Sequence, residues 1–273
     1  MDFPFQNCIV SAESFSCPQT RKLLEYQHGM TCILLDLQRL EEEMQKLGKE
    51  KVLAHYLSRR EQGCLVRFTS DKRKREWLGG RIAAKHVAAG VQAQNGNALP
   101  WSGLPIIADE NGRPFLAVDK KSTALPDISI SHSGNLAAAM AISKGYCGID
   151  IQKVTDRVVK VRERFCTLDE VQIVQSFFSA PRTKHSSALT KLWAAKEALR
   201  KVANMSSLPG FLELELTEIL EGPSQRDPGP WKFIFIWKHI DINGNPVTEK
   251  CSVAVSLIED YALALTTRND TLG

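Results

Sequence analysis

An acidic side chain and several basic side chains share one short stretch with a tryptophan, and together they could hold a cation or an anionic substrate. The stretch runs from Leu192 to Lys201. At 3.6 residues per turn, Trp193, Glu197 and Lys201 fall on one face of a helix. Apolar residues in the same stretch indicate that this face is partly buried, where a carboxylate needs a partner to remain charged. An ordinary amphipathic helix with an exposed Glu197–Lys201 pair has the same spacing.

A second acidic group lies on a predicted strand, in the sequence Gly148-Ile149-Asp150-Ile151-Gln152. Side chains alternate across a strand, so Asp150 and Gln152 point to the same side. Together with Glu197 they form a set of oxygen ligands suited to Mg²⁺, which binds carboxylates and substrate phosphate oxygens. A strand end that exposes polar groups to water is the alternative interpretation.

Two further segments are suited to binding phosphate. Residues 128–134 place three serines and His132 next to a glycine, and their hydroxyls and backbone amides could contact a phosphate. A tight hairpin whose serines bond their own backbone is the alternative. Arg113 lies between Gly112 and Pro114 on a predicted turn and suits bidentate phosphate binding, unless it is simply a surface arginine.

Composition indicates a globular protein with a mild positive charge. The chain has 273 residues, 43% of them hydrophobic, and a net charge of +4. No apolar run approaches the roughly 18 residues of a membrane span, and the N-terminus does not resemble a signal peptide. Seven scattered cysteines form no Cys-x-x-Cys pair, so we expect reduced thiols and a cytoplasmic protein. Between Arg59 and His86 there are nine Lys and Arg residues and three acidic residues. This local excess of positive charge suits phosphate groups, an acidic protein partner or nucleic acid. The alternative interpretation is a solvated helix face.

From about residue 30 the chain uses one order of predicted elements twice. Each half begins with an apolar strand, continues through helices and ends in strands. Each half also carries a capping box, Ser58-x-x-Glu61 or Thr167-x-x-Glu170. This order predicts an α+β fold of two similar subdomains with a site at their junction. We place an irregular N-terminal extension at 1–29, an N-terminal subdomain at 30–145 and a C-terminal subdomain at 146–273.

Taken in order, these motifs resemble the 4′-phosphopantetheinyl transferases of the surfactin-synthetase-activating (Sfp) type. The matching segments are Gly112–Pro114, Ser129–Gly134, Gly148–Gln152 and Trp193–Ala198 with Lys201. The resemblance implies two pseudo-two-fold-related subdomains, each with an antiparallel sheet and packed helices. It also implies an enzyme that moves the phosphopantetheine arm of coenzyme A to a serine of an apo acyl or peptidyl carrier protein. Such an enzyme releases 3′,5′-ADP and uses Mg²⁺.

The resemblance also implies residue roles. Asp150 and Glu197 would hold the metal, with Gln152 as a third ligand. Lys196 and Lys201 match basic residues beside the pyrophosphate of coenzyme A. Glu197, directly or through water, is a candidate base for the carrier serine, and Lys201 is a candidate acid for the leaving phosphate. The residues expected to bind the phosphates of coenzyme A are Arg75, Arg113, Ser131 and His132.

Gln152 departs from the family pattern, because many members have glutamate there and an amide oxygen brings no charge. A catalytically weak relative that binds coenzyme A or a carrier protein as a regulatory module is therefore the alternative. A third hypothesis is a nucleic-acid-binding protein. Against this hypothesis, the basic segment lacks the interleaved aromatic residues that stack on the bases of single strands. We expect a monomer with an acidic carrier as partner, steered by the basic segment 67–85, and with no nucleic-acid or membrane partner.

Overall fold

The computed structural model covers residues 1–273 and describes residues 5–10, 29–94, 104–117, 125–179, 184–203, 208–221, 230–240 and 244–269. The chain divides into two compact units. Of the described residues, unit 1 holds those up to Cys147 together with Arg268 and Asn269, and unit 2 holds those from Gly148 to Thr267. Within the described residues, no helix is long and apolar enough to cross a membrane.

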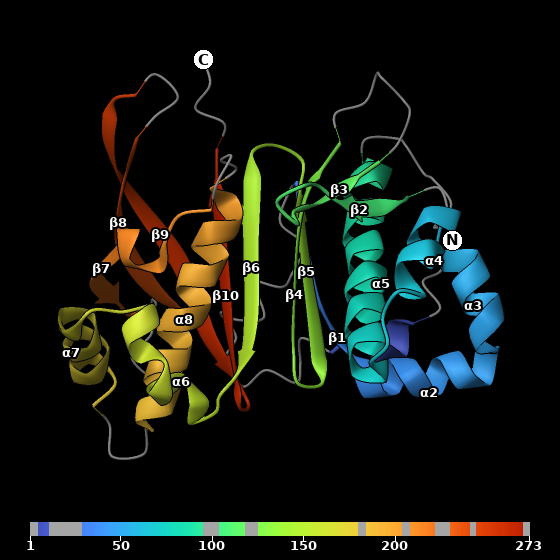
Figure 1. The fold of residues 1–273 in the computed structure, drawn as a ribbon, viewed down its shortest axis with the longest axis horizontal. Helices are drawn as coiled ribbons and strands as arrows, with labels where there is room; N and C mark the ends of the chain where they lie inside the picture. Colours follow the sequence, from blue (N-terminus) through green and yellow to red (C-terminus); the bar gives the residue numbers. More distant parts are fainter. Residues whose placement is uncertain are drawn as a thin grey trace. The chain divides into compact units, whose positions relative to one another are not determined.

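Unit 1 packs helices against a small antiparallel sheet. Its strands are β1 (Met30–Asp36), β2 (Ile106–Ala108), β3 (Pro114–Leu116), β4 (Asp127–Ser133) and β5 (Leu136–Ile142). Its helices are η1 (Gln6–Cys8), α2 (Leu37–Leu47), α3 (Lys49–Tyr56), α4 (Arg59–Leu65) and α5 (Asp71–Gln94). The sheet order is β1-β5-β4, and β2 pairs with β3 separately. The long helix α5 contacts all three strands of the sheet and covers it (Figure 1).

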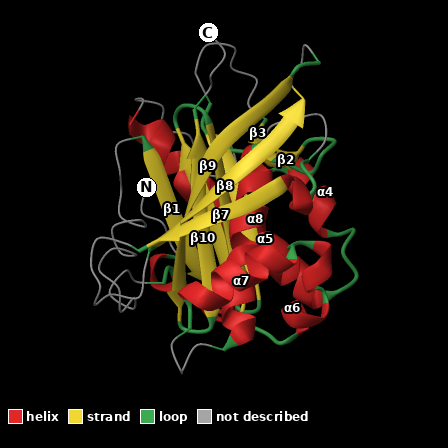
Figure 2. Ribbon diagram, turned by 90° about the vertical axis from the view of Figure 1, so that its left-hand side faces the viewer, coloured by secondary structure: helices red, strands yellow, loops and turns green. Residues whose placement is uncertain are grey.

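Unit 2 repeats this plan with a larger sheet. Its strands are β6 (Tyr146–Lys153, which begins in unit 1), β7 (Leu214–Leu220), β8 (Trp231–Ile240), β9 (Pro246–Ile258) and β10 (Tyr261–Arg268, which ends in unit 1). Its helices are α6 (Arg157–Lys160), η4 (Arg162–Arg164), α7 (Leu168–Phe177), α8 (His185–Val202) and η5 (Phe211–Glu213). The sheet order is β6-β10-β9-β8-β7. Figure 2 shows this twisted sheet, against which α7 and α8 pack through β7 and β9.

The predicted α+β fold with antiparallel sheets is confirmed, and so are several local signals. Both capping boxes form, at Ser58 with Glu61 and at Thr167 with Glu170. The helical segments that follow β6 are short, with one turn in α6 and a 3₁₀ turn in η4. The β-branched Val158, Val159 and Val161 disfavour a longer helix there. The pseudo-two-fold relation stays a prediction, although the order β1-β5-β4 in unit 1 matches β6-β10-β9 in unit 2.

Each unit has its own apolar core. In unit 1, α5 lies close to α2 and β4 at two glycines: a side chain at Gly79 would collide with Leu37, and one at Gly80 would approach Ile130. These contacts agree with the close packing that adjacent glycines predict.

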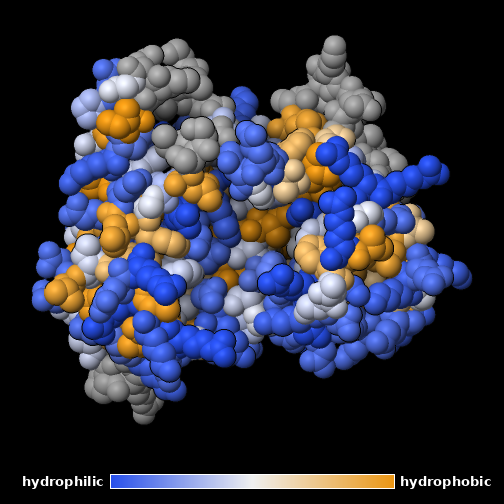
Figure 3. Space-filling model, viewed as in Figure 1, coloured by the Kyte–Doolittle hydropathy of each residue, from blue (hydrophilic) through white to orange (hydrophobic). Residues whose placement is uncertain are grey.

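Figure 3 shows mainly hydrophilic residues, with separate hydrophobic groups among them, on the visible face. The six cysteines that the structure describes form no disulfide.

The first described residues belong to the core of unit 1. Phe5 is fully buried and its ring lies 5.2 Å from that of Tyr56. Val10 donates a backbone hydrogen bond to the carbonyl of Leu34 in β1. The expectation of an irregular N-terminal extension at 1–29 did not foresee this packing, because Phe5 stands alone in a segment with no hydrophobic period. Residues 11–28 lie outside the described part of the chain.

Candidate active site

Gly148 allows strand β6 and helix α8 to lie against each other. A Cβ atom at this position would collide with the carbonyl oxygen of Ala198. Any larger residue would push the strand away from the helix. The glycine of the Gly-Ile-Asp motif therefore sets the distance between the strand that carries Asp150 and the helix that carries Glu197.

Asp150 is joined directly to α8. Its side chain is buried, and Lys201 donates a 2.9 Å hydrogen bond to its Oδ1 atom. The same ammonium group donates a 2.7 Å bond to the carbonyl oxygen of Ile149. Asp150 and Lys201, which lie 51 residues apart in sequence, thus form one charged pair in unit 2.

Glu197 lies one turn before Lys201 on α8, and its side chain is 24% exposed. Burial raises the pKa of its carboxyl group, and the negative charge of Asp150 raises that pKa further. Lys201 and Arg200 oppose the rise in pKa. Asp150 and Glu197 thus lie on a strand and a helix that contact each other at Gly148, and a cation bound by both carboxylates would favour their charged forms.

An aromatic group flanks this charged face. Trp193 packs edge-on against Phe165 and lies 5.0 Å, between ring centroids, from Phe211. Arg200 lies over the ring of Phe211 at 4.2 Å and donates a 2.8 Å bond to the carbonyl of Pro209. The predicted face of Trp193, Glu197 and Lys201 is confirmed as half-buried.

Lys196 takes a different place from the one that the resemblance implies. It is completely buried, and its ammonium pairs with Glu170 at 2.6 Å. It also donates to the carbonyls of Phe165 and Phe211, at 2.8 and 3.0 Å. An ammonium has three donor hydrogens, and these three acceptors use them all. In this geometry Lys196 has no donor left for a phosphate, so we assign it to the interior of unit 2.

Unit 1 contains the same arrangement. Lys85 is also completely buried, pairs with Glu61 at 2.9 Å and donates a 2.7 Å bond to the carbonyl of Leu104. Each glutamate is the capping-box residue of its unit, and each accepts a hydrogen bond from a backbone amide further along the chain, that of Ile106 or Leu216. Sequence reasoning missed both pairs. The repeated Ala-Ala-Lys of α5 and α8, following a capping box in each half, is the signal that could have revealed them.

The two arginines of unit 1 that were expected to bind phosphate each pair with a carboxylate. Arg113 pairs with Asp127 and lies over the ring of Tyr146 at 5.6 Å. Arg75 on α5 pairs with Glu41 on α2 at 3.1 Å. Both guanidinium groups are therefore held by carboxylates of their own unit, and a phosphate would compete with those carboxylates.

Ser131 and His132 are neighbours on β4, so their side chains point to opposite faces of the strand. Ser131 is buried, whereas 44% of the His132 side chain is exposed. His132 Nδ1 lies 3.7 Å from Glu76 Oε2. Strand β4 is followed by a turn at Gly134, which has a positive φ, and then by β5, with which it pairs. This is the hairpin of the alternative interpretation.

The donor set in unit 2 is compatible with a hard divalent cation. Among the described residues, no three His, Cys, Asp or Glu side chains are arranged to hold a metal by themselves. Asp150 and Glu197 provide two carboxylates, and Gln152 follows Asp150 by two residues on β6 and is partly exposed. A metal here would need further oxygen ligands from substrate or water, as is usual for Mg²⁺.

Comparison with known proteins identifies the family. Residues 146–266 match the model of the 4′-phosphopantetheinyl transferase superfamily. The holo-[acyl-carrier-protein] synthase of Bacillus subtilis (strain 168) is 31% identical over 109 residues, which are 40% of this chain and 90% of the relative. The chain belongs to the 4′-phosphopantetheinyl transferase superfamily. It is therefore a transferase, and the matched residues include all the candidate site residues of unit 2.

A longer member of this group aligns over more of the chain. Enterobactin synthase component D of Salmonella typhi is 31% identical over 160 residues, which are 56% of this chain and 58% of the relative. Among solved structures, a holo-(acyl-carrier-protein) synthase from Bacillus anthracis str. Ames, in complex with CoA (3',5'-ADP), is 22% identical. It covers 42% of this chain and 93% of its own, with a TM-score of 0.34. The assignment to the phosphopantetheinyl transferases rests on the sequence matches.

Proposed function

We propose that this chain transfers the 4′-phosphopantetheine group of coenzyme A to a serine of an apo acyl or peptidyl carrier protein and releases 3′,5′-ADP. The observation that carries the proposal is the charged cluster of Asp150, Glu197 and Lys201, formed on two elements of the unit that matches the superfamily. In the reaction, the serine oxygen forms a bond to the phosphorus that bears pantetheine, and the bond from that phosphorus to the ADP oxygen breaks.

Each residue of the cluster has a proposed role. Glu197 accepts the serine proton, directly or through water. Lys201 is the proposed acid that protonates the departing phosphate. Asp150 holds Lys201 in position through the 2.9 Å bond. Transfer of this kind depends on charge neutralisation and positioning more than on covalent help from the protein.

Asp150 and Glu197, with Gln152 as a neutral third ligand, are the residues that would hold Mg²⁺. Bound there, Mg²⁺ would neutralise charge on the pyrophosphate of coenzyme A. Arg75, Arg113, Ser131 and His132 of unit 1 are proposed to bind its phosphates, with His132 near the 3′-phosphate. For Arg75 and Arg113 this requires release from the carboxylates that now bind them.

We further propose that the enzyme is of the Sfp type, acts as a monomer and takes an acidic carrier. The alignment over 160 residues with enterobactin synthase component D, which extends beyond the length of the Bacillus relative's match, supports the type. Arg67, Lys72 and Arg73 are exposed and supply positive charge that would steer an acidic partner. Steering of this kind predicts that the KM for the carrier rises with salt.

The test is incubation of the protein with coenzyme A, Mg²⁺ and a panel of apo carrier proteins from fatty-acid, polyketide and nonribosomal-peptide systems. We expect one or more carriers to gain the mass of phosphopantetheine. A serine-to-alanine variant of the responding carrier is the control and should gain nothing. If no carrier gains mass while the protein binds coenzyme A in a calorimeter, the proposed reaction is wrong.

That last outcome would favour the second candidate, a regulatory module that binds coenzyme A or a carrier protein. The observation on its side is Gln152, which leaves the site one negative charge short of the pattern common in the family. Asp150, Glu197 and Lys201 remain in place and argue for catalysis.

A further inference from the structure

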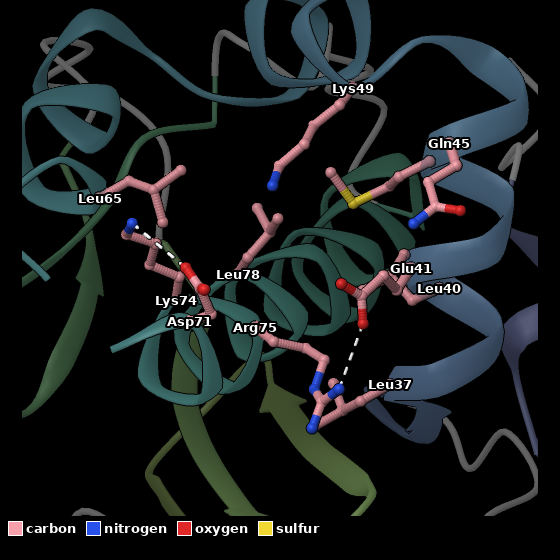
Figure 4. A pocket seen from close by; sticks show the side chains of 11 residues that line it. Leu37, Leu40, Glu41, Gln45, Lys49, Leu65, Asp71, Lys74, Arg75 and Leu78 are labelled. Carbon is pink, nitrogen blue, oxygen red and sulfur yellow. Dashed lines mark hydrogen bonds and ion pairs between the residues drawn. The ribbon is translucent and has the colours of Figure 1, made fainter. Parts of the chain in front are cut away.

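Unit 1 has a pocket of which only one lining residue, Arg75, has a role in the proposed reaction. It lies among α2, the first residue of α3, the end of α4 and the first turns of α5 (Figure 4). Its volume is about 270 Å³. The residues that line it are Leu37, Leu40, Glu41, Met44, Gln45, Lys49, Leu65, Asp71, Lys74, Arg75 and Leu78. All of these residues belong to one compact unit.

The apolar part of the lining is entirely aliphatic. It consists of four leucines and Met44, and all five are buried. Leucine and methionine side chains adapt to a flexible chain, and none of the described residues that line the pocket is an aromatic residue that could stack on a planar ligand. The lining therefore favours a short aliphatic chain over a flat ring.

Charged residues at the pocket leave one positive charge unbalanced. Arg75 pairs with Glu41 at 3.1 Å, and Lys74 pairs with Asp71 at 3.4 Å. Lys49 makes no ion pair with any described residue. Figure 4 shows its ammonium reaching from the start of α3 toward the space above Leu78.

We propose that this pocket binds an amphipathic monoanion, a medium-chain aliphatic carboxylate whose chain lies on the leucines and whose carboxylate pairs with Lys49. The size of the pocket sets the length of the chain. An apolar cavity of about 150 Å³ holds benzene, with six heavy atoms. By that scale, 270 Å³ holds roughly ten heavy atoms. Octanoate has this size and charge.

The inference does not rest on the proposed transfer reaction, because binding is measured without coenzyme A or carrier. Octanoate is titrated into the full chain in an isothermal titration calorimeter, and octanol and octylammonium serve as neutral and cationic analogues of equal length. We expect saturable binding of one octanoate, weaker binding of octanol and none of octylammonium. No saturable heat from octanoate, or equal binding of octylammonium, would overturn the proposal.

Variants at Lys49 and Leu78 test whether octanoate binds in this pocket. Lys49→Gln should weaken octanoate binding about two- to fivefold, the range for a partly exposed ion pair, and leave octanol unchanged. Lys46→Gln is the matched control, since Lys46 is a nearby exposed lysine that pairs with Glu43 and does not line the pocket. Leu78→Phe should fill the pocket and abolish binding of both molecules. Octanoate binding that Lys49→Gln and Lys46→Gln affect equally would place the carboxylate elsewhere and overturn the assignment.

Discussion

At the scale of single residues, the chemistry of unit 2 depends on three charges held at short range. Lys201 binds Asp150, and Asp150 in turn raises the pKa of Glu197, behind the larger effect of burial. Glu197 is thus kept in an environment that disfavours its own charge. Functional sites often contain such groups, because the arrangement serves the reaction and costs stability.

The first prediction concerns Glu197→Gln. Losing the proposed base and metal ligand should lower kcat for carrier modification by about a hundredfold or more, the usual contribution of a positioned base. The thermal midpoint should stay equal or rise, because a carboxylate with a raised pKa is less stable in the folded state when ionised. Asp260→Asn, at an exposed carboxylate paired with Lys153, is the control and should leave both quantities unchanged. Turnover near the starting value in Glu197→Gln would remove this residue from the mechanism.

The second prediction concerns Gln152→Glu. If Gln152 ligates the metal, a third carboxylate should lower the Mg²⁺ concentration needed for half-maximal activity, because negative charge strengthens binding of a hard cation. The measurement is an activity titration with Mg²⁺ and with Mn²⁺. Superimposable curves for the variant and the original protein would place Gln152 outside the metal's ligands.

At the scale of elements, α8 carries lysines in three different environments. Lys201 is half-buried and pairs with Asp150, whereas Lys196 is enclosed with Glu170. Lys191 is 2% exposed and pairs with no carboxylate among the described residues. It donates to the hydroxyl of Ser187 and lies over the rings of Phe178 and Trp231, at 4.3 and 4.9 Å.

The third prediction uses the duplicated buried pairs. Lys196→Met and Lys85→Met should each destabilise the protein by about 3–5 kcal/mol, because each leaves a glutamate buried without its cation. Adding Glu170→Gln to Lys196→Met should recover part of the loss, since the amide oxygen can still accept from the backbone. Urea unfolding measures these effects, and no loss of stability in either single variant would contradict the pairing.

The same double variant tests the role of Lys196. Because Lys196 bonds, among the described residues, to interior acceptors alone, the folded double variant should keep kcat within severalfold of the original. A loss of a hundredfold or more with the fold intact would restore a direct role for Lys196 at the phosphates.

The fourth prediction concerns pH and Lys191. Burial lowers its pKa from 10.5 to about 8. Below about pH 8 the lysine is protonated in both the folded and unfolded states. The full cost of burying its charge then lowers the free energy of unfolding. Between about 8 and 10.5 the folded state releases its proton first, so the free energy of unfolding rises with pH. Lys191→Met should remove this rise and stabilise the protein at pH 7 by up to about 3 kcal/mol.

Urea unfolding at pH 7 and pH 10 measures the Lys191 effect as the difference between the variant and the original protein. That difference should be large at pH 7 and small at pH 10. A difference that does not change with pH would show that Lys191 titrates normally.

At the scale of the whole molecule, the described part of unit 1 comes from separate segments of the chain, whereas that of unit 2 comes from one stretch. Unit 1 uses residues near both ends of the described chain: Phe5 lies in its core, and the backbone of Arg268 lies so close to Gly145 that a side chain there would collide with it. The described part of unit 2 runs from Gly148 to Thr267. The family model matches residues 146–266, which include all of this part except Thr267.

The fifth prediction tests the contribution of the first residues to unit 1. Phe5→Ala should cost about 3–5 kcal/mol, the usual loss for a fully buried phenylalanine. Phe115→Ala, at a position 42% exposed in the same unit, is the control and should cost much less. Equal losses in urea unfolding would mean that Phe5 does not pack as described.

Much of the fold was predictable, because its signals are local. Leu37, Leu40 and Met44 predict α2 by their spacing, and Gly48 ends the helix with a positive φ. Asp150 was predictable as a chemical residue because few carboxylates lie on an apolar strand. The capping role of Glu61 was equally local, whereas its pairing with Lys85, 24 residues away, was not.

The sequence by itself determined the order of elements, the α+β class and the candidate residues Asp150, Glu197 and Lys201, since spacing and residue type are local properties of a chain. Only the tertiary structure decided that Lys196 serves the interior and Lys201 the charged face. The two lysines are alike in chemistry and lie five residues apart on one helix. Which of them meets a buried glutamate and which meets Asp150 depends on the face of α8 that packs against the rest of unit 2, and packing involves residues distant in sequence.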